Sequence, residues 1–206
     1  MIGVVLGDDI KDQIDELVKM DAPLKNMETD EPISTVQDKI LSANVYFGAF
    51  PIVEALHKGA NIIITGRTTD TGLTLAPMIY EFGWKNTDYD LLSAGTVAGH
   101  ILECGGQSSG GNFLGDWQSI PNLAEIGFPI AEAYPNGEVI ITKHYNTGGR
   151  VSFETVAEQL LYEIGDPKSY ITPDCVADFT SIKLEDLGND RVKMFDVKGL
   201  PETEFY

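Results

Sequence analysis

The clearest strand signal in the chain is Asn61-Ile62-Ile63-Ile64, which Thr65-Gly66-Arg67 follows directly. Consecutive β-branched residues of this kind are typical of a parallel strand that is buried on both faces. A helix is expected to begin near Asp70, because apolar residues recur there at helical spacing, namely Leu73, Leu75, Met78 and Ile79. A strand followed by a helix at this distance predicts an α/β unit.

The same order of elements is expected upstream. Residues 2–6 form an apolar run that ends at Gly7-Asp8-Asp9, which predicts a second buried strand, and a helix over residues 10–18 follows it. Residues 21–38 are polar and without periodicity, so they predict an extended acidic loop.

A third apolar stretch, residues 43–47, precedes a helix that has Pro51 in its first turn and ends at Lys58-Gly59. Apolar strand-like segments and helices therefore alternate through this half of the chain. The predicted fold class is α/β, with a largely parallel sheet flanked by helices.

The pattern changes in the second half. A helix from Asp88 to Cys104 is rich in alanine and glycine, which indicates close packing against another backbone, and residues 105–122 predict a loop. Residues 129–133 and 138–143 flank a Pro-Asn-Gly turn and predict a β-hairpin.

The last part of the chain predicts one more helix and two strands. The helix is capped by Ser152, with Thr155 three residues later in place of the usual glutamate, so the capping box is expected to be incomplete. The strands are expected at 175–184 and 191–197, joined by a Gly-Asn-Asp turn.

The length of the chain suits a single domain with a substantial core. We expect one α/β domain over residues 1–206, in which a βαβα portion (1–111) precedes a smaller, hairpin-containing α+β portion (112–206).

Charge and composition exclude several classes of partner. The chain has 32 acidic and 14 basic side chains, a net charge of −18, which repels phosphate backbones and argues against a nucleic-acid partner. No apolar run reaches the roughly 18–20 residues of a membrane span, so no membrane role is expected, and the first residues do not resemble a signal peptide. The two cysteines, Cys104 and Cys175, fit neither a disulfide framework nor a zinc ribbon, so a cytoplasmic location is expected.

Polar residues at strand ends are the first candidate sites, because ligands of open α/β sheets bind beyond the carboxyl ends of the strands. The carboxylates of Asp8 and Asp9 could hold a divalent metal, or serve only as an N-cap and a solvated neighbour. At Thr65-Gly66-Arg67, close backbone approach and a planar guanidinium predict a site for an anionic cofactor or substrate group. Asp70 is either a catalytic carboxylate there or the ion-pair partner of Arg67.

A histidine and a glutamate recur near the end of the alanine-rich helix. His100 faces Glu103 and Cys104 one helical turn later, a pattern that suits general acid–base chemistry. Two ligands and a weak third do not complete a zinc site. The alternative is a hydrogen-bonded helix terminus with no catalytic role.

Two glycine turns complete the set of candidates. Gly105-Gly106-Gln107 follows the helix, and Thr147-Gly148-Gly149 precedes the helix at Ser152. Both could bind phosphate through their amides, and both could equally be connectors or tight turns. The patterns GxxxxGK[ST], GxGxxG and GxSxG are absent from the sequence.

Seven short motifs carry a further signal. They are SANVYFGA (42–49), ITGR (64–67) with Asp70, EFGW (81–84), AGH (98–100) with LECG (102–105), GFPIAE (127–132), TGG (147–149) and EQLLYEI (158–164) with DP (166–167). Taken together and in this order, they resemble the acyclic terpene utilisation protein family over nearly the whole chain.

The resemblance implies a role in bacterial catabolism of branched isoprenoid acids such as citronellic and geranic acids, carried as CoA esters, alongside biotin-dependent acyl-CoA carboxylases. It implies no particular reaction and transfers no catalytic residue. Arg150 departs from the apolar residue that usually follows the paired glycines. Family members are usually longer at both ends, so we expect a partner chain or a homo-oligomer to supply missing regions.

Two functions are open at this point. One is an enzyme core that acts on acyl-CoA thioesters of branched or acyclic terpenoid acids by lyase- or hydratase-like proton chemistry, with His100, Glu103 and Asp70 as catalytic groups. The other is a non-catalytic binding or scaffold subunit of a complex associated with an acyl-CoA carboxylase. In the enzyme, one cleft should be lined by Asp8, Arg67, His100, Glu103 and Gly148-Gly149. In the scaffold, these residues should be dispersed or paired structurally.

Overall fold

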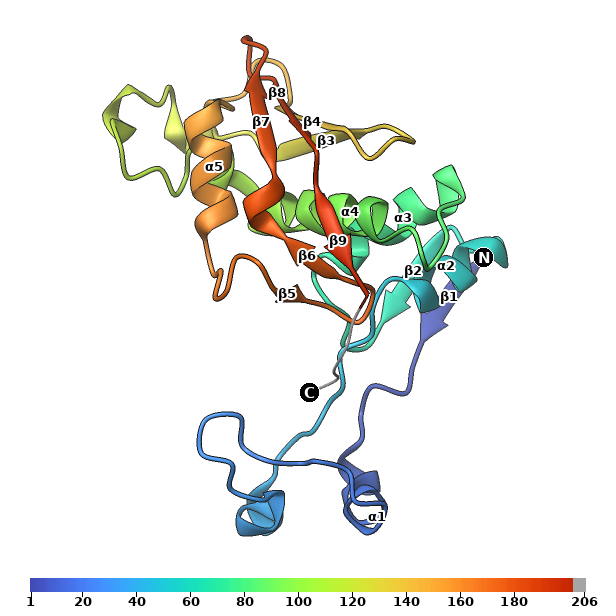
Figure 1. Ribbon diagram of the computed structural model, residues 1–206. Coiled ribbons are helices and arrows are strands. Elements are labelled where there is room, and N and C mark those ends of the chain that lie inside the picture. The colour runs from blue at the N-terminus through green and yellow to red at the C-terminus, as the bar shows by residue number, and fades with distance from the viewer. Residues whose placement is uncertain (202–206) are drawn as a thin grey trace.

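A computed structural model describes residues 1–201 of the chain (Figure 1). Its helices are α1 (Ile14–Lys19), α2 (Phe50–His57), α3 (Gly72–Phe82), α4 (Tyr89–Glu103) and α5 (Phe153–Leu161). Its strands are β1 (Ile2–Val5), β2 (Ile62–Thr65), β3 (Pro129–Ala133), β4 (Val139–Lys143), β5 (Tyr170–Ile171), β6 (Val176–Asp178), β7 (Lys183–Asp186), β8 (Val192–Phe195) and β9 (Lys198–Leu200). No helix within the described residues is long and apolar enough to cross a membrane.

The sheets are small and mostly antiparallel. β1 and β2 form a two-stranded parallel sheet, with Ile2 opposite Ile62 and Val5 opposite Thr65. A second sheet has the order β3-β4-β8-β7 and a third the order β5-β6-β9, and all their pairings are antiparallel. The prediction of a largely parallel sheet flanked by helices is therefore wrong.

One cause of this difference is the apolar stretch 43–47. It crosses the carboxyl ends of β1 and β2 and does not add a strand beside them. The Val45 N–H donates to the Asp8 carbonyl at 2.8 Å, and Phe47 forms an isolated bridge to Thr68. Val45 and Tyr46 stay 38% and 53% exposed, so apolar composition here does not reflect burial in a sheet.

The β1–β2 sheet is covered on one face only. A Cβ atom at Gly3 would lie 3.1 Å from Ala55, which shows how closely α2 packs on that face. On the other face, the four isoleucine and valine side chains are 58–61% exposed, namely Ile2, Val4, Ile62 and Ile64. The prediction that β2 is buried on both faces is therefore wrong for the described part of the chain.

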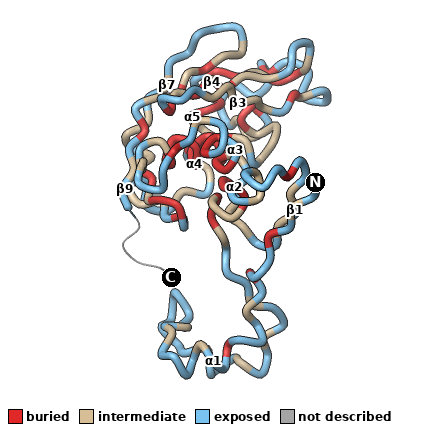
Figure 2. The backbone as a smooth tube through the Cα atoms, turned by 90° about the vertical axis from the view of Figure 1, so that its right-hand side faces the viewer, coloured by how far each residue is buried: buried red, intermediate tan, exposed pale blue. Residues whose placement is uncertain are grey.

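Residues 9–44 leave the body as an arm (Figures 1 and 2). Its root is closed by a bridge between Asp9 and Asn44 and by an Ile10 N–H that donates to the Ala43 carbonyl at 2.9 Å. The helix expected over 10–18 is reduced to a 3₁₀ turn and the six residues of α1. Ile14 is the only buried residue of the arm, so the arm has almost no core of its own.

The helix α4 lies at the centre of the body (Figure 2). Every residue from Leu92 to Ile101 is buried. A Cβ atom at Gly99 would lie 2.6 Å from the Cα atom of Thr71, and one at Gly95 would lie 2.5 Å from the Leu75 side chain. The predicted close packing of this helix against another backbone is confirmed, and its partner is α3.

Of the predictions for the second half, the hairpin is confirmed, and the strand over 175–184 and the incomplete capping box are not. The hairpin is β3–β4, turned at Gly137 with φ +82°. The strand expected over 175–184 is divided by a 3₁₀ turn into β6 and β7, which belong to different sheets. The capping box of α5 is complete, contrary to expectation, because the hydroxyl of Thr155 accepts the Ser152 N–H at 3.0 Å as a glutamate would.

Candidate functional site

The carboxyl ends of β1 and β2 meet at Asp8, which is 9% exposed. Its Oδ2 atom accepts the backbone N–H of Arg67 at 2.9 Å and the side-chain amide of Asn44 at 2.9 Å. A Cβ atom at Gly66 would lie 1.9 Å from Asp8 Oδ1, so only glycine leaves room for this carboxylate. The Arg67 N–H is the main reason that the pKa of Asp8 is below its ordinary value. Asp8 therefore holds the residue 44 and residue 67 segments together at the strand ends.

Arg67 and Tyr46 lie side by side on these two segments. The Phe47 N–H donates to the Arg67 carbonyl at 3.2 Å, and the Thr68 hydroxyl donates to the Phe47 carbonyl at 2.8 Å. The guanidinium carbon of Arg67 is 6.0 Å from the Tyr46 ring centroid, and both residues are exposed. Within residues 1–201, no carboxylate lies within 4.0 Å of the Arg67 guanidinium, so the alternative of an Arg67–Asp70 ion pair is not realised.

The other two arginines of the chain have side-chain partners. Arg191 forms a bidentate pair with Glu132, at 3.0 and 2.6 Å. Arg150 donates to the Ser119 hydroxyl at 3.2 Å, and its guanidinium lies over the Phe113 ring. Arg67 is thus the arginine that the described residues leave open to an external anion.

Asp174 is a site residue that sequence reasoning did not identify. It is 6% exposed, and both carboxylate oxygens lie 2.9 Å from the backbone nitrogen of Ala49, at the start of α2. A Cβ atom at Gly48 would lie 2.3 Å from Asp174 Oδ1. A cap supplied from 125 residues away has no local sequence signal, so periodicity and motifs could not reveal it.

The predicted metal ligands hold the backbone in this structure. Asp8 is used as described, and the Asp9 carboxylate accepts the Lys11 N–H at 3.1 Å. Among the residues described, no three His, Cys, Asp or Glu side chains are grouped as a metal site. The assignment of Asp8 and Asp9 to a metal stays a prediction, without support from the donor set.

His100 is fixed in the core by one of its ring nitrogens. Its Nε2 atom lies 3.1 Å from the carbonyl oxygen of Gln159, and the Gln159 side-chain amide donates back to the His100 carbonyl at 3.1 Å. The ring is 1% exposed and makes edge contacts with Tyr170 and Phe179. Because a carbonyl can only accept, Nε2 carries the hydrogen of this contact.

The second ring nitrogen of His100 faces a carboxylate. Nδ1 lies 3.1 Å from Glu103 Oε1, and the Glu103 side chain is 17% exposed. The contact is not aligned as a hydrogen bond, and Nδ1 has no hydrogen-bond partner among the described residues. One nitrogen of the ring is therefore fixed, and the other is directed at an acid that solvent can reach.

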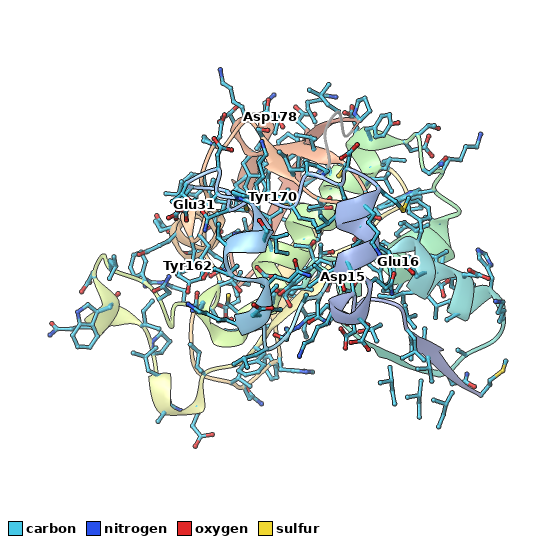
Figure 3. The ribbon with its side chains drawn as sticks, turned by 90° about the horizontal axis from the view of Figure 1, so that it is seen from below. Asp15, Glu16, Glu31, Tyr162, Tyr170 and Asp178 are labelled. Carbon is cyan, nitrogen blue, oxygen red and sulfur yellow. The ribbon has the colours of Figure 1, made fainter. Side chains whose placement is uncertain are left out.

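The charges of three carboxylates act on Tyr170 and Cys104. Burial, and then the charges of Glu103, Asp70 and Glu163, raise the pKa of Tyr170 to about 12. Burial, and then the same three charges, also raise the pKa of Cys104, against a hydrogen bond from Gln159. Figure 3 shows Tyr170 and Tyr162 on the body, viewed past the arm that carries Asp15, Glu16 and Glu31. Two of the predicted catalytic residues, Asp70 and Glu103, thus act on the same two side chains, and His100 contacts Glu103.

The predicted glycine turn at residues 147–149 is held by hydrogen bonds within the chain. The amides of Gly148 and Gly149 donate to the carbonyls of Glu125 and Pro121, at 2.7 and 2.8 Å. The Thr147 hydroxyl donates to His144 at 2.7 Å. These bonds match the tight-turn alternative, and phosphate binding at residues 147–149 stays a prediction.

The loop after α4 packs against this turn. Gly105 and Gly106 begin a 3₁₀ turn, and the Arg150 N–H donates to the Ser109 carbonyl at 2.8 Å. The side-chain oxygens of Gln107, Ser108 and Ser109 are buried and lack a partner in the described structure. Buried polar atoms of this kind usually bind ordered water or a ligand, so the loop remains a candidate for polar contacts.

The candidate site therefore comprises two parts. The strand-end part contains Asp8, Tyr46 and Arg67, and the helix part contains His100 and Glu103. Thr71, the residue before α3, lies against Gly99 of α4. The single cleft expected for the enzyme stays a prediction.

Fold and site define a protein of mixed helices and small sheets, with a buried histidine beside a glutamate on its central helix and one parallel strand pair. The chain matches the family described as "Acyclic terpene utilisation family protein AtuA" over residues 1–206, its whole length, and it belongs to this family. The resemblance carried by the seven sequence motifs is thereby confirmed, and with it a role in acyclic terpene utilisation. Comparison with curated proteins gave no match, and comparison with solved structures gave none either.

Proposed function

We propose that the chain is the core of an enzyme that acts on CoA thioesters of branched or acyclic terpenoid acids by proton transfer, as a lyase or hydratase does. The observation that supports this most directly is the contact between His100 and Glu103. A buried histidine with one nitrogen fixed and the other directed at a carboxylate suits general acid–base chemistry.

The path of the proton follows from this contact. The Gln159 carbonyl holds the Nε2 hydrogen, so Nδ1 is the atom that accepts or releases a proton. Glu103 is the more exposed member of the pair and exchanges the proton with the substrate, and His100 receives or returns it. Asp70 is a second carboxylate, which exchanges a proton with the group that the reaction adds or removes.

Tyr170 supplies a hydrogen-bond donor in this scheme. With a pKa of about 12, its phenol keeps its proton at neutral pH. A protonated phenol beside a thioester can donate to the carbonyl oxygen as negative charge develops there. Arg67 anchors an anionic group of the same substrate.

Proton exchange tests this proposal without knowledge of the full reaction. The chain is incubated in D₂O with the CoA ester of geranic or citronellic acid, and deuterium uptake is followed by mass spectrometry. We expect uptake by the wild type, slowed roughly 10²–10⁴-fold in Glu103→Gln and His100→Gln. Glu16→Gln, an exposed change of the same kind on the arm, should exchange like the wild type. Absence of exchange in the wild type with both esters would refute the enzyme proposal.

One observation favours the scaffold alternative. The uncovered face of β1–β2 exposes Ile62 and Ile64 at 58% each, and a surface of this kind usually has a partner. In that case the chain would be a binding subunit beside an acyl-CoA carboxylase, or a homo-oligomer. Light scattering at micromolar concentration distinguishes the homo-oligomer from the subunit of another complex, because a strictly monomeric mass would count against self-association.

The cellular location belongs to the same proposal. Both cysteines, Cys104 and Cys175, are free thiols. Free thiols suit a reducing compartment, and we therefore propose a cytoplasmic site of action.

A further inference from the structure

We propose that Tyr46 and Arg67 form a binding site for a nucleotide, in which the base stacks on the Tyr46 ring and a phosphate pairs with the Arg67 guanidinium. The site would hold the nucleotide end of a substrate or cofactor. It deepens the function proposed above by naming a ligand class, but it stands on side chains that take no part in proton transfer.

The first argument is that the two side chains are positioned by the backbone. Phe47 pairs with Thr68 in parallel register, so the preceding residues, Tyr46 and Arg67, lie next to each other. The buried carboxylate of Asp8 fixes both segments through Asn44 and the Arg67 N–H. A placement set by backbone pairing and a buried carboxylate is better ordered than two side chains on free loops.

The second argument is that, within residues 1–201, no hydrogen bond or ion pair occupies either side chain. The separation of 6.0 Å between the guanidinium and the ring is at the outer limit of a cation–π contact. Among the described residues, no carboxylate lies within 4.0 Å of the guanidinium. The chain has a net charge of −18, so most of its surface repels anions. The open guanidinium of Arg67 attracts an anion locally.

The third argument is the chemistry of the pair. A guanidinium binds phosphate with two parallel hydrogen bonds, and an exposed tyrosine ring accepts the flat face of a base. The pair also lies at the carboxyl ends of the parallel strands β1 and β2. A carboxylate ligand would use Arg67 but would leave Tyr46 without a role.

Binding of ADP by calorimetry tests the proposal, with EDTA present so that no metal contributes. We expect Tyr46→Leu to weaken binding roughly tenfold and Tyr46→Phe to keep it within about twofold, since the ring is what stacks. Arg67→Gln should weaken binding at least about tenfold. Lys19→Gln, which removes the same charge from the exposed arm, should have no effect. Tyr46 and Arg67 are exposed, so their substitution should leave the fold intact, and melting curves of each variant without ligand check this.

Fragments of the ligand separate its two contacts. Arg67→Gln should weaken the binding of ribose 5-phosphate, and Tyr46→Leu should not. Tyr46→Leu should weaken the binding of adenosine, and Arg67→Gln should not. Failure of the wild type to bind ADP at millimolar concentration would overturn the proposal. ADP binding that both Tyr46→Leu and Arg67→Gln leave unchanged would also overturn it. So would a site at Arg67 that binds free geranate but not ADP. His100→Gln should leave ADP affinity unchanged, so failure of proton exchange with intact ADP binding would count only against the enzyme reaction.

Discussion

His100 Nδ1 lies 3.1 Å from Glu103 Oε1, and the Glu103 side chain is not fully buried. The histidine is 1% exposed and its carboxylate partner reaches solvent, so the pair connects the core of the body to its surface. The other ring nitrogen is held by the Gln159 carbonyl on α5. The two nitrogens of this ring therefore have different surroundings.

We expect Tyr170 to titrate at about pH 12. Burial is the main cause, and the charge of Glu103 comes next, so Glu103→Gln should lower this pKa while leaving it above 10. A raised tyrosine pKa contributes stability that is complete below pH 10 and is lost as the pH rises towards 12. Ultraviolet titration of tyrosinate, compared with Tyr170→Phe, measures the value. A Tyr170 that ionises near its ordinary pKa would show that the phenol is not enclosed.

The stability difference between the wild type and Asp8→Asn should depend on pH. The pKa of Asp8 is lowered from 3.8, so its ionised form stabilises the fold above that value, and the contribution is lost as the pH falls through the lowered pKa. We expect the variant to melt below the wild type at pH 7 and the gap to narrow towards pH 3. Asp12→Asn on the arm is the matched control and should show a small gap at every pH. A gap of constant size would contradict a role for the Asp8 charge.

The contact between α3 and α4 should tolerate no side chain at Gly99. A Cβ atom there would lie 2.6 Å from Thr71 Cα and 2.7 Å from its carbonyl oxygen, so Gly99→Ala forces the helices apart. Overpacking of this kind costs about 1–3 kcal/mol. Gly165→Ala meets no atom within 4 Å and should be nearly neutral. Urea unfolding of both variants measures the difference, and equal stabilities would refute the close approach.

Removing the remote cap of α2 should destabilise the fold. Asp174→Ala leaves the Ala49 N–H without its acceptor at the start of the helix, a loss of about 0.5–2 kcal/mol. Asp174→Asn keeps one side-chain acceptor oxygen and should lose less. Thermal melts of the pair test the assignment. If both variants matched the wild type, the cap would have no energetic role.

Truncation of two isoleucines should lower the free energy of unfolding by unequal amounts, because one of them lies on the uncovered face of β1–β2. Ile141 is fully buried, so Ile141→Ala should cost about 2–5 kcal/mol. Ile64 is 58% exposed, and Ile64→Ala should cost far less. Chemical denaturation at two protein concentrations provides the test. A large cost for Ile64→Ala that grows with concentration would show that another chain covers this face.

Much of the fold could be predicted where a local signal determines the element. Pro51 and Lys58-Gly59 mark the two ends of α2, and the Pro-Asn-Gly turn marks the β3–β4 hairpin. Sheet composition could not be predicted, because the apolar stretch 43–47 looks like a strand whether or not its backbone pairs. The arm was also missed, since polar composition indicates a loop without indicating where it projects.

The candidate site also has residues that the sequence predicts and residues that it does not. His100 and Glu103 were predictable because helical spacing alone brings them together. The Asp174 cap, the Gln159 carbonyl and the Tyr46–Arg67 neighbourhood depend on tertiary contacts, which no local pattern encodes. Family membership followed from ordered motifs and required no knowledge of the contacts.

Long-range ¹H–¹⁵N spectra of the imidazole rings test the His100–Glu103 pair most directly. The chain has only three histidines, so His100→Gln identifies the signals of residue 100. We expect a protonated Nε2 that exchanges slowly, and an Nδ1 signal that shifts in Glu103→Gln and stays unchanged in Glu16→Gln. A ring protonated only at Nδ1, or one that does not respond to Glu103→Gln, would contradict the proton-transfer role proposed for this pair.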